Sequence, residues 1–510
     1  MRNVFKFLCI LALAVPSAAA ESDDAMKHAW PNWRGPDCSG SVDDGIELVD
    51  DLSTAALLWK SEEQVPNSYG RFGEKKDHAN GGFCDPVVAD GKVFLYYNLP
   101  SASGAIAENY LDASKYKNYH EKLGMDMVRK VAAIAADDFF ICLDAATGKL
   151  LWKQQFKEKG FNWCDLRCYP HSPQCIPAYA DGRLYGQGSA GKIYCLDAKD
   201  GRLNWEADGG EMARKMETIK AEYTQKKEKP GPQPGSPWAT DHIGTLFDTS
   251  VLVADGVVVV CDAFRKAKGE GHGMSGLDAK TGKLLWNVPG CMKQYVSPVR
   301  WTHEGKGYAI GAGPKRTVCV EPKTGEIVWD ITGENVHAAG GTPAVADDIM
   351  VLCGHPGKMS KKVAATMAEK DGYVGYRLSL SGAEKLWSYK VKDGGCKDNS
   401  YIIHRGRLYT MMVKDGKRGL ACLDVRTGEI LGVLEPRGGT GYAPIAANGR
   451  LLLATSPITY VNADPTDYAA ITPGNKEMTP GTYLHPVVAG GKLYYRGANH
   501  LYCWDLRKRK

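Results

Sequence analysis

An eleven-residue pattern recurs along this chain in a fixed register. Each copy starts with a small residue, continues through an acidic residue and a Thr-Gly or Asp-Gly pair, and ends on tryptophan. The complete copies are Cys142–Trp152, Cys195–Trp205, Gly276–Trp286 and Cys319–Trp329. Cys422–Gly432 lacks only the tryptophan, and Arg377–Trp387 keeps only the hydrophobic end and the tryptophan. Six copies in one register are an internal repeat, and a repeat decides the architecture before other features do.

A second pattern precedes each copy and completes the repeat unit. Pro177–Gly186 shows it as a short strand, an Asp-Gly turn and another strand. Turns this short join antiparallel strands, because parallel strands need long crossovers. Each unit is therefore expected to hold four short antiparallel strands, and four-stranded units of about 40–45 residues are typical of propeller blades. The sequence predicts an all-β protein, a β-propeller.

Counting the units gives eight blades. Seven blades are the alternative, because the seventh unit, from Ala443 to about Ile471, lacks a clear Thr-Gly turn and tryptophan. The last unit, His485–Leu506, has only three strands, and Thr54–Lys60 reads as a separate fourth one. We expect that strand to close the ring, since closure removes exposed sheet edges. The predicted organisation is a lead-in at residues 21–53 and a single propeller domain at 54–508, closed by strand 54–60.

The repeat resembles a known family of propellers. Its spacing is similar to the tryptophan-docking motif of quinoprotein-type (PQQ-repeat) propellers, and Trp30–Pro36 (W-P-N-W-R-G-P) resembles the opening of an exported bacterial subgroup. In that family each tryptophan lies between the small first residue of one motif and the Thr-Gly peptide of its neighbour. The resemblance covers nearly all of residues 30–508, and it implies a fold rather than an activity.

The first twenty residues have the features of an export signal. Arg2 and Lys6 precede an apolar run from Phe7 to Val15, and Ala18–Ala20 supplies small residues for cleavage. The run is shorter than the roughly 20 residues a membrane span needs, and no later segment could span a membrane. We expect a periplasmic or extracellular monomer, cleaved near Ala20. The formal net charge of +5 is too mild to indicate a nucleic-acid partner.

The long insertions are predicted to share one face. They lie between the second and third strands of a blade or between successive blades, and we call the face they share the insert face; the short turns form the opposite turn face. The insertions are residues 98–138, 153–173, 206–246, 263–273, 354–373 and 455–483. Ala107–Ala136 and Glu211–Lys229 carry helical patterns, so helices are expected on the insert face. Long loops on a rigid scaffold are where binding usually occurs.

The cysteines fall into two groups. Five occupy the same register in different blades: Cys142, Cys195, Cys319, Cys422 and Cys503. Packed sheets lie about 10 Å apart and a disulfide needs Cα atoms within about 7 Å, so these five should be small buried side chains. Cys164, Cys168 and Cys175 surround His171 in a polar loop. They predict one disulfide with a spare thiol, or alternatively a metal site.

Histidines are the main candidates for ligand contact. Seven map to the insert face: His78, His171, His242, His272, His337, His355 and His485. We expect the cofactor or ligand to be bound near the axis by a subset of these and by two aromatic side chains. That candidate set is His171, His242, His337, His355, His485, Trp163 and Trp238. No metal site is assigned, and the alternative is that polar loops simply carry histidines.

Two functions from different classes are compatible with the sequence. The first is an exported propeller that binds a protein partner or a small ligand through the insert face. The alternative is a quinone-dependent periplasmic dehydrogenase, for which the resemblance implies PQQ and calcium. The chain lacks the adjacent cysteine pair that catalytic members often place against the cofactor. A third relative, the lipoprotein that scaffolds outer-membrane barrel assembly, is disfavoured because no lipid-anchor cysteine is present.

Overall fold

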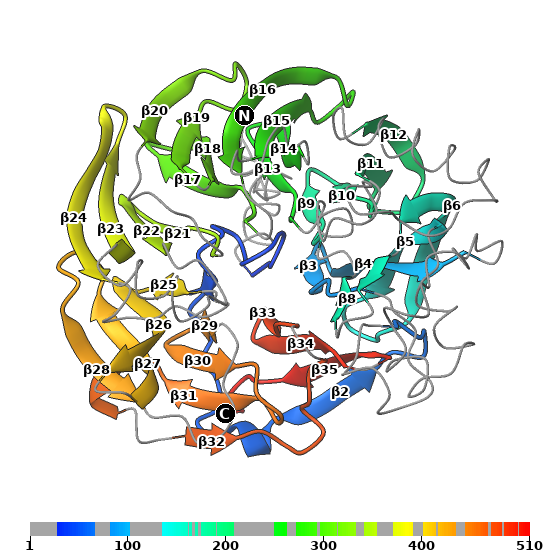
Figure 1. Cartoon of the computed structure of the whole chain (residues 1–510). Coiled ribbons are helices and arrows are strands. Elements are labelled where there is room, and N and C mark those ends of the chain that lie inside the picture. The colour runs from blue at the N-terminus through cyan, green and yellow to red at the C-terminus, as the bar shows by residue number, and fades with distance from the viewer. Residues whose placement is uncertain are drawn as a thin grey trace, which may run out of the picture.

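The computed structural model describes most of the chain from residue 28 onward. The described ranges are 28–66, 82–101, 135–161, 163–165, 169–171, 175–189, 191–208, 249–262, 272–292, 296–313, 315–332, 341–353, 371–390, 401–414, 417–434, 444–467, 471–481, 484–497 and 499–509. Eight antiparallel sheets surround a common axis, so the predicted eight-bladed propeller is confirmed and the seven-bladed alternative is wrong (Figure 1).

The first four blades each run outward from the axis in chain order. Blade 1 is β3 (Val87–Ala89), β4 (Lys92–Pro100), β5 (Ala135–Asp144) and β6 (Leu150–Phe161). Blade 2 is β9 (Ala178–Ala180), β10 (Arg183–Gln187), β11 (Lys192–Asp197) and β12 (Leu203–Asp208). Blade 3 is β13 (Leu252–Ala254), β14 (Val257–Asp262), β15 (His272–Asp278) and β16 (Leu284–Met292). Blade 4 is β17 (Val299–His303), β18 (Lys306–Ala312), β19 (Arg316–Val320) and β20 (Ile327–Thr332).

The remaining blades follow the same order, with additions from the N-terminal part of the chain. Blade 5 is β21 (Ala344–Ala346), β22 (Ile349–Cys353), β23 (Asp371–Ser379) and β24 (Gly382–Lys390). Blade 6 is β25 (Ile402–His404), β26 (Arg407–Lys414), β27 (Lys417–Asp424) and β28 (Ile430–Leu434). Blade 7 is β29 (Pro444–Ala447), β30 (Arg450–Leu453), β31 (Thr459–Asn462) and β32 (Ile471–Pro473), with β1 (Ser41–Val42) added at its inner edge. Blade 8 is β33 (Val487–Ala489), β34 (Lys492–Arg496), β35 (Leu501–Asp505) and, outermost, β2 (Ala56–Lys60).

Strand β2 joins the two ends of the chain. It pairs antiparallel with β35, from Ala56 opposite Asp505 to Lys60 opposite Tyr502. The N-terminal strand β2 and the C-terminal strand β35 thus belong to one blade, so backbone hydrogen bonds between the two ends of the chain close the ring. The pairing leaves β35 with a partner on both sides.

The acidic residue of each repeat organises the turn that follows it. In blade 1, Asp144 Oδ1 accepts hydrogen bonds from the backbone nitrogens of Ala146 and Thr147 and from the Thr147 hydroxyl, at 2.7–3.0 Å. Equivalent contacts recur at Asp278 and Asp424, and Glu321 makes two of them. The side chain replaces missing backbone partners in the turn, which explains why a short acidic residue stands there.

Tryptophans connect most neighbouring blades through one repeated contact. Trp152 lies opposite Cys142 within blade 1, and its ring packs so closely on Gly201 of blade 2 that a Cβ there would lie 2.6 Å away. Its Nε1 also donates to the Ala198 carbonyl at 3.1 Å. The same ring-to-glycine packing and Nε1 hydrogen bond recur for Trp59, Trp205, Trp286 and Trp387, with bonds of 2.5–3.1 Å.

The contact changes where the next blade lacks the turn. Trp329 is buried, but its Nε1 has no hydrogen-bond partner in the described part of the chain, because blade 5 joins β23 to β24 by a tight turn without Thr-Gly. In that blade the small residue opposite Trp387 is Gly375, two residues before the start we expected. Between blades 6 and 7, Gly432 stands in place of the tryptophan. There the Tyr409 hydroxyl donates to the Ala463 carbonyl of blade 7 at 2.5 Å.

The predicted helices are not supported. The described residues form two short 3₁₀ turns, Leu52–Thr54 and Pro465–Asp467, and no α-helix. Most of the two helical patterns lies outside the described residues, but Ala135 and Ala136 belong to strand β5. No helix of the described part is long and apolar enough to cross a membrane.

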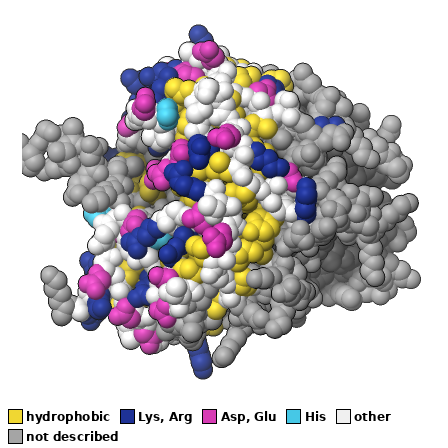
Figure 2. All heavy atoms as spheres, turned by 90° about the vertical axis from the view of Figure 1, so that its left-hand side faces the viewer, with side chains coloured by type: hydrophobic (Ala, Val, Ile, Leu, Met, Phe, Trp, Pro, Cys, Tyr) yellow, Lys and Arg dark blue, Asp and Glu magenta, His cyan; other side chains and the backbone are white. Residues whose placement is uncertain are grey.

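The outer rim carries apolar side chains that the repeat places in water. The two residues before the tryptophan are exposed leucines in several blades: Leu57, Leu58, Leu150, Leu151, Leu284 and Leu285. Figure 2 shows apolar side chains among charged ones on the side of blades 4 to 6. The leucines lie on the outermost strands, where the sheet faces are covered by neighbouring blades only in part. Isolated exposed leucines of this kind are common in folded proteins.

The register cysteines are buried as predicted. Cys142, Cys195, Cys319, Cys422 and Cys503 are all 0% exposed. The thiol pKa of Cys142, Cys319 and Cys503 is raised by burial, to about 12 for Cys142 and Cys503. Raised pKa values keep the thiols protonated, so these side chains act as small apolar groups.

Candidate functional site

The centre of the ring holds a segment of the chain itself. We call residues 28–46 the axial segment; Figure 1 shows its dark blue trace inside the ring of inner strands. Trp30 exchanges backbone hydrogen bonds with Val88 of blade 1 at 2.7 and 2.9 Å, and the Pro31 carbonyl accepts from Tyr179 of blade 2 at 2.7 Å. The axial segment thus begins by adding to the innermost strands of two successive blades.

Across the axis the segment contacts the opposite blades. Arg34 is buried and donates from Nη1 to the carbonyls of Thr342 and Pro343, at 3.3 and 3.2 Å, where blade 5 begins. Its guanidinium carbon lies 4.6 Å from the ring centre of Trp33 and 5.6 Å from that of Tyr401. A guanidinium is weakly hydrated and stacks on aromatic faces, so arginine suits this buried position better than lysine.

The segment then continues along blades 6 and 7. The Ser39 carbonyl accepts from Ile403 at 3.3 Å, the Gly40 carbonyl accepts from Ala446 at 2.9 Å, and β1 pairs in parallel with β29. A Cβ at Gly40 would lie 2.2 Å from Ile402, and this glycine has φ +80°. Only glycine fits a backbone that approaches the inner strand this closely in a left-handed conformation.

Near blade 4 the segment carries an exposed acid and a buried thiol. Partial desolvation raises the pKa of Asp37, and the nearby Arg300 partly offsets the rise. Cys38 is 3% exposed, donates to Asn32 Oδ1 at 3.4 Å and shares an apolar cluster with Val299. The axial segment therefore crosses the channel and contacts its walls on opposite sides.

Three polar contacts border the insert-face end of the channel. In each, the residue two positions before the first strand of one blade bonds from its backbone nitrogen to the side chain at the same position of the next blade. Ser250 donates to Ser297 Oγ at 2.8 Å, Ser297 to Thr342 Oγ1 at 3.0 Å, and His485 to Asp85 Oδ1 at 2.7 Å. We call this set the mouth contacts; His485–Asp85 is the ionisable pair among them.

The pair orients an imidazole toward a hollow. His485 Nδ1 lies 2.9 Å from Asp85 Oδ2, and the two side chains are 22% and 7% exposed. The carboxylate can only accept in its ionised form, so Nδ1 carries the proton and Nε2 is left as an acceptor. Within the described residues Nε2 has no hydrogen-bond partner.

The hollow itself is small. Asp85 and His485 line it together with Trp33, Arg34, Ile176 and Pro444. Ile402 of blade 6 also lines it, so the hollow lies between blades 1, 2, 6, 7 and 8, with Trp33 and Arg34 of the axial segment contributed from inside the channel. The centres of water-sized molecules can occupy about 20 Å³ of it, enough for little more than one water or one small side chain.

A buried arginine supports the wall of the hollow. Arg496 of β34 is 0% exposed, and its Nη1 donates to the carbonyls of Gly82 and Cys84 at 3.2 and 3.4 Å; Nη2 bonds to Pro66. Burial lowers the pKa of Arg496 to about 10, still high enough for a charged side chain at neutral pH. The backbone just before Asp85 is thereby held against blade 8.

The structure places three of the predicted site residues. His485 lines the hollow. Trp163 and His171 lie opposite each other in a separate hairpin of β7 (Trp163–Asp165) and β8 (Tyr169–His171), and their side chains lie outside the described residues. The other candidates, His242, His337, His355 and Trp238, also lie outside them.

Neither the metal interpretation nor the disulfide interpretation is tested. No group of three or more His, Cys, Asp or Glu side chains that could hold a metal occurs among the described residues. Cys175 is 1% exposed, but the side chain of Cys164 and the whole of Cys168 lie outside the described part. The pairing of these three cysteines stays a prediction.

Three residues of the hollow were not among the sequence candidates. Trp33 and Arg34 belong to the W-x-x-W-R-G-P opening, a pattern that indicates the family and gives no sign of a site. Asp85 could have been found from its position, since Asp85-Pro86 and His485-Pro486 stand at the same offset from the first strand of their blades. Equivalent offsets in a closed ring place residues side by side around the axis.

Comparison with known proteins gives one family and several distant relatives. A family model described as outer membrane protein assembly factor BamB matches residues 141–300 and 275–510. Tetrathionate hydrolase of Acidithiobacillus ferrooxidans is 23% identical over 344 residues, which cover 61% of this chain and 60% of that protein. The dehydrogenase subunit of the quinone-type alcohol dehydrogenase of Acetobacter aceti is 29% identical over 144 residues, 28% of this chain and 16% of that protein. This chain thus matches less than two thirds of the length of either relative.

A solved structure agrees with the fold. Quinohemoprotein alcohol dehydrogenase from Comamonas testosteroni superposes with a TM-score of 0.57 at 11% identity, covering 98% of this chain and 83% of that one. At that identity the agreement concerns the arrangement of blades and says nothing of the chemistry.

Proposed function

This chain belongs to the family of the outer membrane protein assembly factor BamB, and we propose that it binds a protein partner through its insert face, at the mouth of the central channel. A lipid-anchor cysteine would attach such a protein to a membrane, but membership of the family does not depend on that cysteine. We further propose that residues 1–20 direct export, that cleavage occurs near Ala20, and that the mature protein is a monomer.

The observation that carries the proposal is the axial segment inside the channel. Its residues Trp30, Arg34 and Gly40 bond on opposite sides of the axis, and the hollow beside Trp33 and Arg34 at the mouth is narrow. The remaining hollow suits one inserted side chain, whereas pockets for small organic ligands measure about 300–1,000 Å³. A protein partner anchors itself through a few such insertions surrounded by a broader contact.

The hollow favours a partner side chain or chain terminus that packs on an aromatic ring and also donates a hydrogen bond. Trp33 offers an aromatic face, and His485 offers Nε2 as an acceptor held in place by Asp85. Tryptophan and arginine are enriched where partners bind most tightly, and a polar group fixed by a carboxylate costs little entropy on binding.

The described residues do not fit PQQ with calcium. PQQ is a flat tricyclic quinone with three carboxylates, larger than the hollow between Trp33 and His485. The described part of the chain also lacks a cluster of ligands for a cation beside it. We therefore derive no step through that cofactor, and the dehydrogenase alternative becomes an outcome of the test below.

Site-specific photocrosslinking tests the proposal in the exporting cell. A crosslinking residue at Pro486, beside the hollow, should yield a discrete protein adduct, and the same residue at Glu304, in a turn on the opposite face, should not. Trp33→Ala and His485→Ala should each lower the yield of the Pro486 adduct about tenfold or more, which corresponds to the 1.4 kcal/mol or more expected of an anchor residue.

Two results would contradict the proposal. Equal adducts from Pro486 and Glu304 would mean that the insert face is not selective. Tight binding of added PQQ and calcium by the purified protein, with a change in its absorbance, would favour the dehydrogenase instead.

A further inference from the structure

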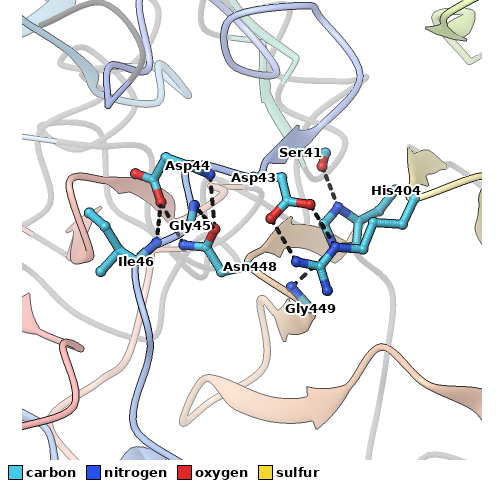
Figure 3. Close-up of polar contacts among 9 residues, drawn as sticks. Ser41, Asp43, Asp44, Gly45, Ile46, His404, Asn448 and Gly449 are labelled. Atoms are coloured by element: carbon cyan, nitrogen blue, oxygen red, sulfur yellow. Dashed lines mark hydrogen bonds and ion pairs between the residues drawn. The ribbon is translucent and has the colours of Figure 1, made fainter. Parts of the chain in front are cut away.

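A buried histidine fastens the axial segment to blades 6 and 7. His404, the last residue of β25, is 2% exposed and uses both ring nitrogens (Figure 3). Nδ1 lies 2.6 Å from Ser41 Oγ of the axial segment, and Nε2 lies 3.1 Å from the backbone nitrogen of Gly449 in blade 7. One imidazole thus bridges three parts of the chain that are far apart in sequence.

The contacts determine the charge of the ring. The Gly449 N–H can only donate, so Nε2 must accept and carries no proton. The ring proton is therefore on Nδ1, and the Ser41 hydroxyl oxygen accepts it. If Nε2 were also protonated, its N–H would face the Gly449 N–H inside the protein. Two donors cannot form a hydrogen bond, so the contact with Gly449 would be lost.

The neighbouring charges oppose protonation. Burial and, after it, Arg405 lower the pKa of His404 to about 4, and Arg407 acts in the same direction. Asp43 acts in the opposite direction, but its carboxylate is bound by Arg405 through two hydrogen bonds of 2.6 and 2.7 Å. These three side chains are the charged groups that influence the ring.

The sign of the pH effect follows. A released histidine titrates near 6.5, so between about 6.5 and 4 the released form takes up a proton that the fastened form does not. The equilibrium constant for fastening has its full value above about pH 6.5. It falls by up to roughly tenfold per pH unit as the pH falls toward 4.

We propose that His404 is an acid-sensitive fastening of the axial segment, which loosens residues 39–46 from blades 6 and 7 while the ring of blades stays closed. The other contacts of this stretch hold it at neutral pH. Asp44 bonds to Asn448 (Figure 3), and its Oδ2 lies 2.9 Å from Nδ1 of His28, whose side chain is 35% exposed and so is not buried as that of His404 is. The blade junctions at Trp152 and Trp387 likewise depend on tryptophan and backbone groups that do not titrate in this range.

The consequence for binding rests on the proposed function. Trp33 and Arg34 belong to the same axial segment and line the hollow. Loosening the segment would disturb the hollow and lower partner binding in acid. The fastening itself can be tested without a partner, so a failure of one idea is distinguishable from a failure of the other.

Hydrogen exchange on the full chain measures the fastening directly. After correction for intrinsic exchange rates, the fraction of open molecules reported by peptides covering residues 39–46 should rise by up to about tenfold per pH unit between 6.5 and 4.5, while that of a β11 peptide stays constant. His404→Gln, which can still accept from Gly449 but cannot take up a proton, should remove this pH dependence. His303→Gln, a histidine of blade 4, should leave it unchanged.

The proposal is overturned if residues 39–46 of the natural protein exchange equally at pH 6.5 and 4.5, or if His404→Gln keeps the full pH dependence. Should His404→Gln fail to fold, Ser41→Ala serves instead. It removes the acceptor of the Nδ1 proton and keeps the imidazole, so residues 39–46 should open more at every pH while opening still increases below about pH 6.5; exchange equal to that of the natural protein across this range would also overturn the proposal.

Discussion

The rim and the axis join the blades in opposite ways. At the rim, the contact between Trp152 and the Gly201 turn is repeated at four other junctions with nearly the same hydrogen bond. At the axis, each contact of the axial segment is different: a backbone bridge at Trp30, a stacked guanidinium at Arg34, a parallel strand at Ser41. Repetition at the rim sets the number and spacing of blades, and the unrepeated contacts at the axis make the ring asymmetric.

Because the rim contacts are repeated and the axial contacts are not, the rim should tolerate the loss of one contact better than the axis. A rim contact can be weakened at one junction while the others remain, as the natural variation at Trp329 shows. The axial segment contacts several blades at once, so its loss should be felt across the ring. The following changes test this comparison.

Removing the axial segment together with the closing strand should have the largest effect. Deletion of residues 21–60 exposes the edge of β35 and empties the channel, so we expect aggregation or loss of a folding stability of about 5–15 kcal/mol. Thermal unfolding and light scattering measure it. Deleting only Arg509 and Lys510 should change neither, and a truncated protein that melts cooperatively at the parental temperature would refute the role of these residues.

Single tryptophan replacements should reveal the value of the rim contact. Trp152→Ala removes a buried ring and its hydrogen bond, with an expected loss of about 3–5 kcal/mol in denaturant unfolding. Trp329→Ala removes a ring with no hydrogen-bond partner in the described residues, so its loss should be smaller by about 1 kcal/mol. Equal losses would mean that packing alone decides the contact.

A pair of glycine replacements in blade 2 should separate packing from backbone strain. Gly201 and Gly182 have φ +75° and +73°, but an added Cβ meets the Trp152 ring at the first and nothing within 4 Å at the second. Gly201→Ala should therefore destabilise by about 1–3 kcal/mol more than Gly182→Ala. A similar loss for both in chemical denaturation would contradict the close packing on Trp152.

The smallest effect is expected at an exposed ion pair of the axial segment. Asp43 accepts two hydrogen bonds from Arg405, and the two side chains are 40% and 55% exposed. Asp43→Asn should cost about 0.2–1 kcal/mol in low salt and less in high salt. A loss above 2 kcal/mol would show that this end of the axial segment depends on charge rather than on its backbone contacts.

The candidate site was predictable only in part. His485 was chosen because loops of the insert face converge on the axis, and it lines the hollow. Its partner Asp85 stands 400 residues away in sequence, and only the equal offset of the two residues from the first strands of their blades links them. Trp33 and Arg34 looked like the start of a lead-in, and nothing in their own neighbourhood indicated that they would enter the channel.

The sequence by itself determined the repeat, the eight blades, the turns at residues such as Asp144, and the burial of Cys142 and its equivalents. Those features depend on short-range patterns: strand alternation, turn chemistry and a fixed spacing, each of which acts within one blade or between adjacent blades. Only the tertiary structure decided that the axial segment crosses the channel and that His404 and His485 acquire their partners. These contacts join residues about 300 to 400 positions apart, and they form because ring closure brings every inner strand to one axis, where the first segment of the chain can bond to several of them at once.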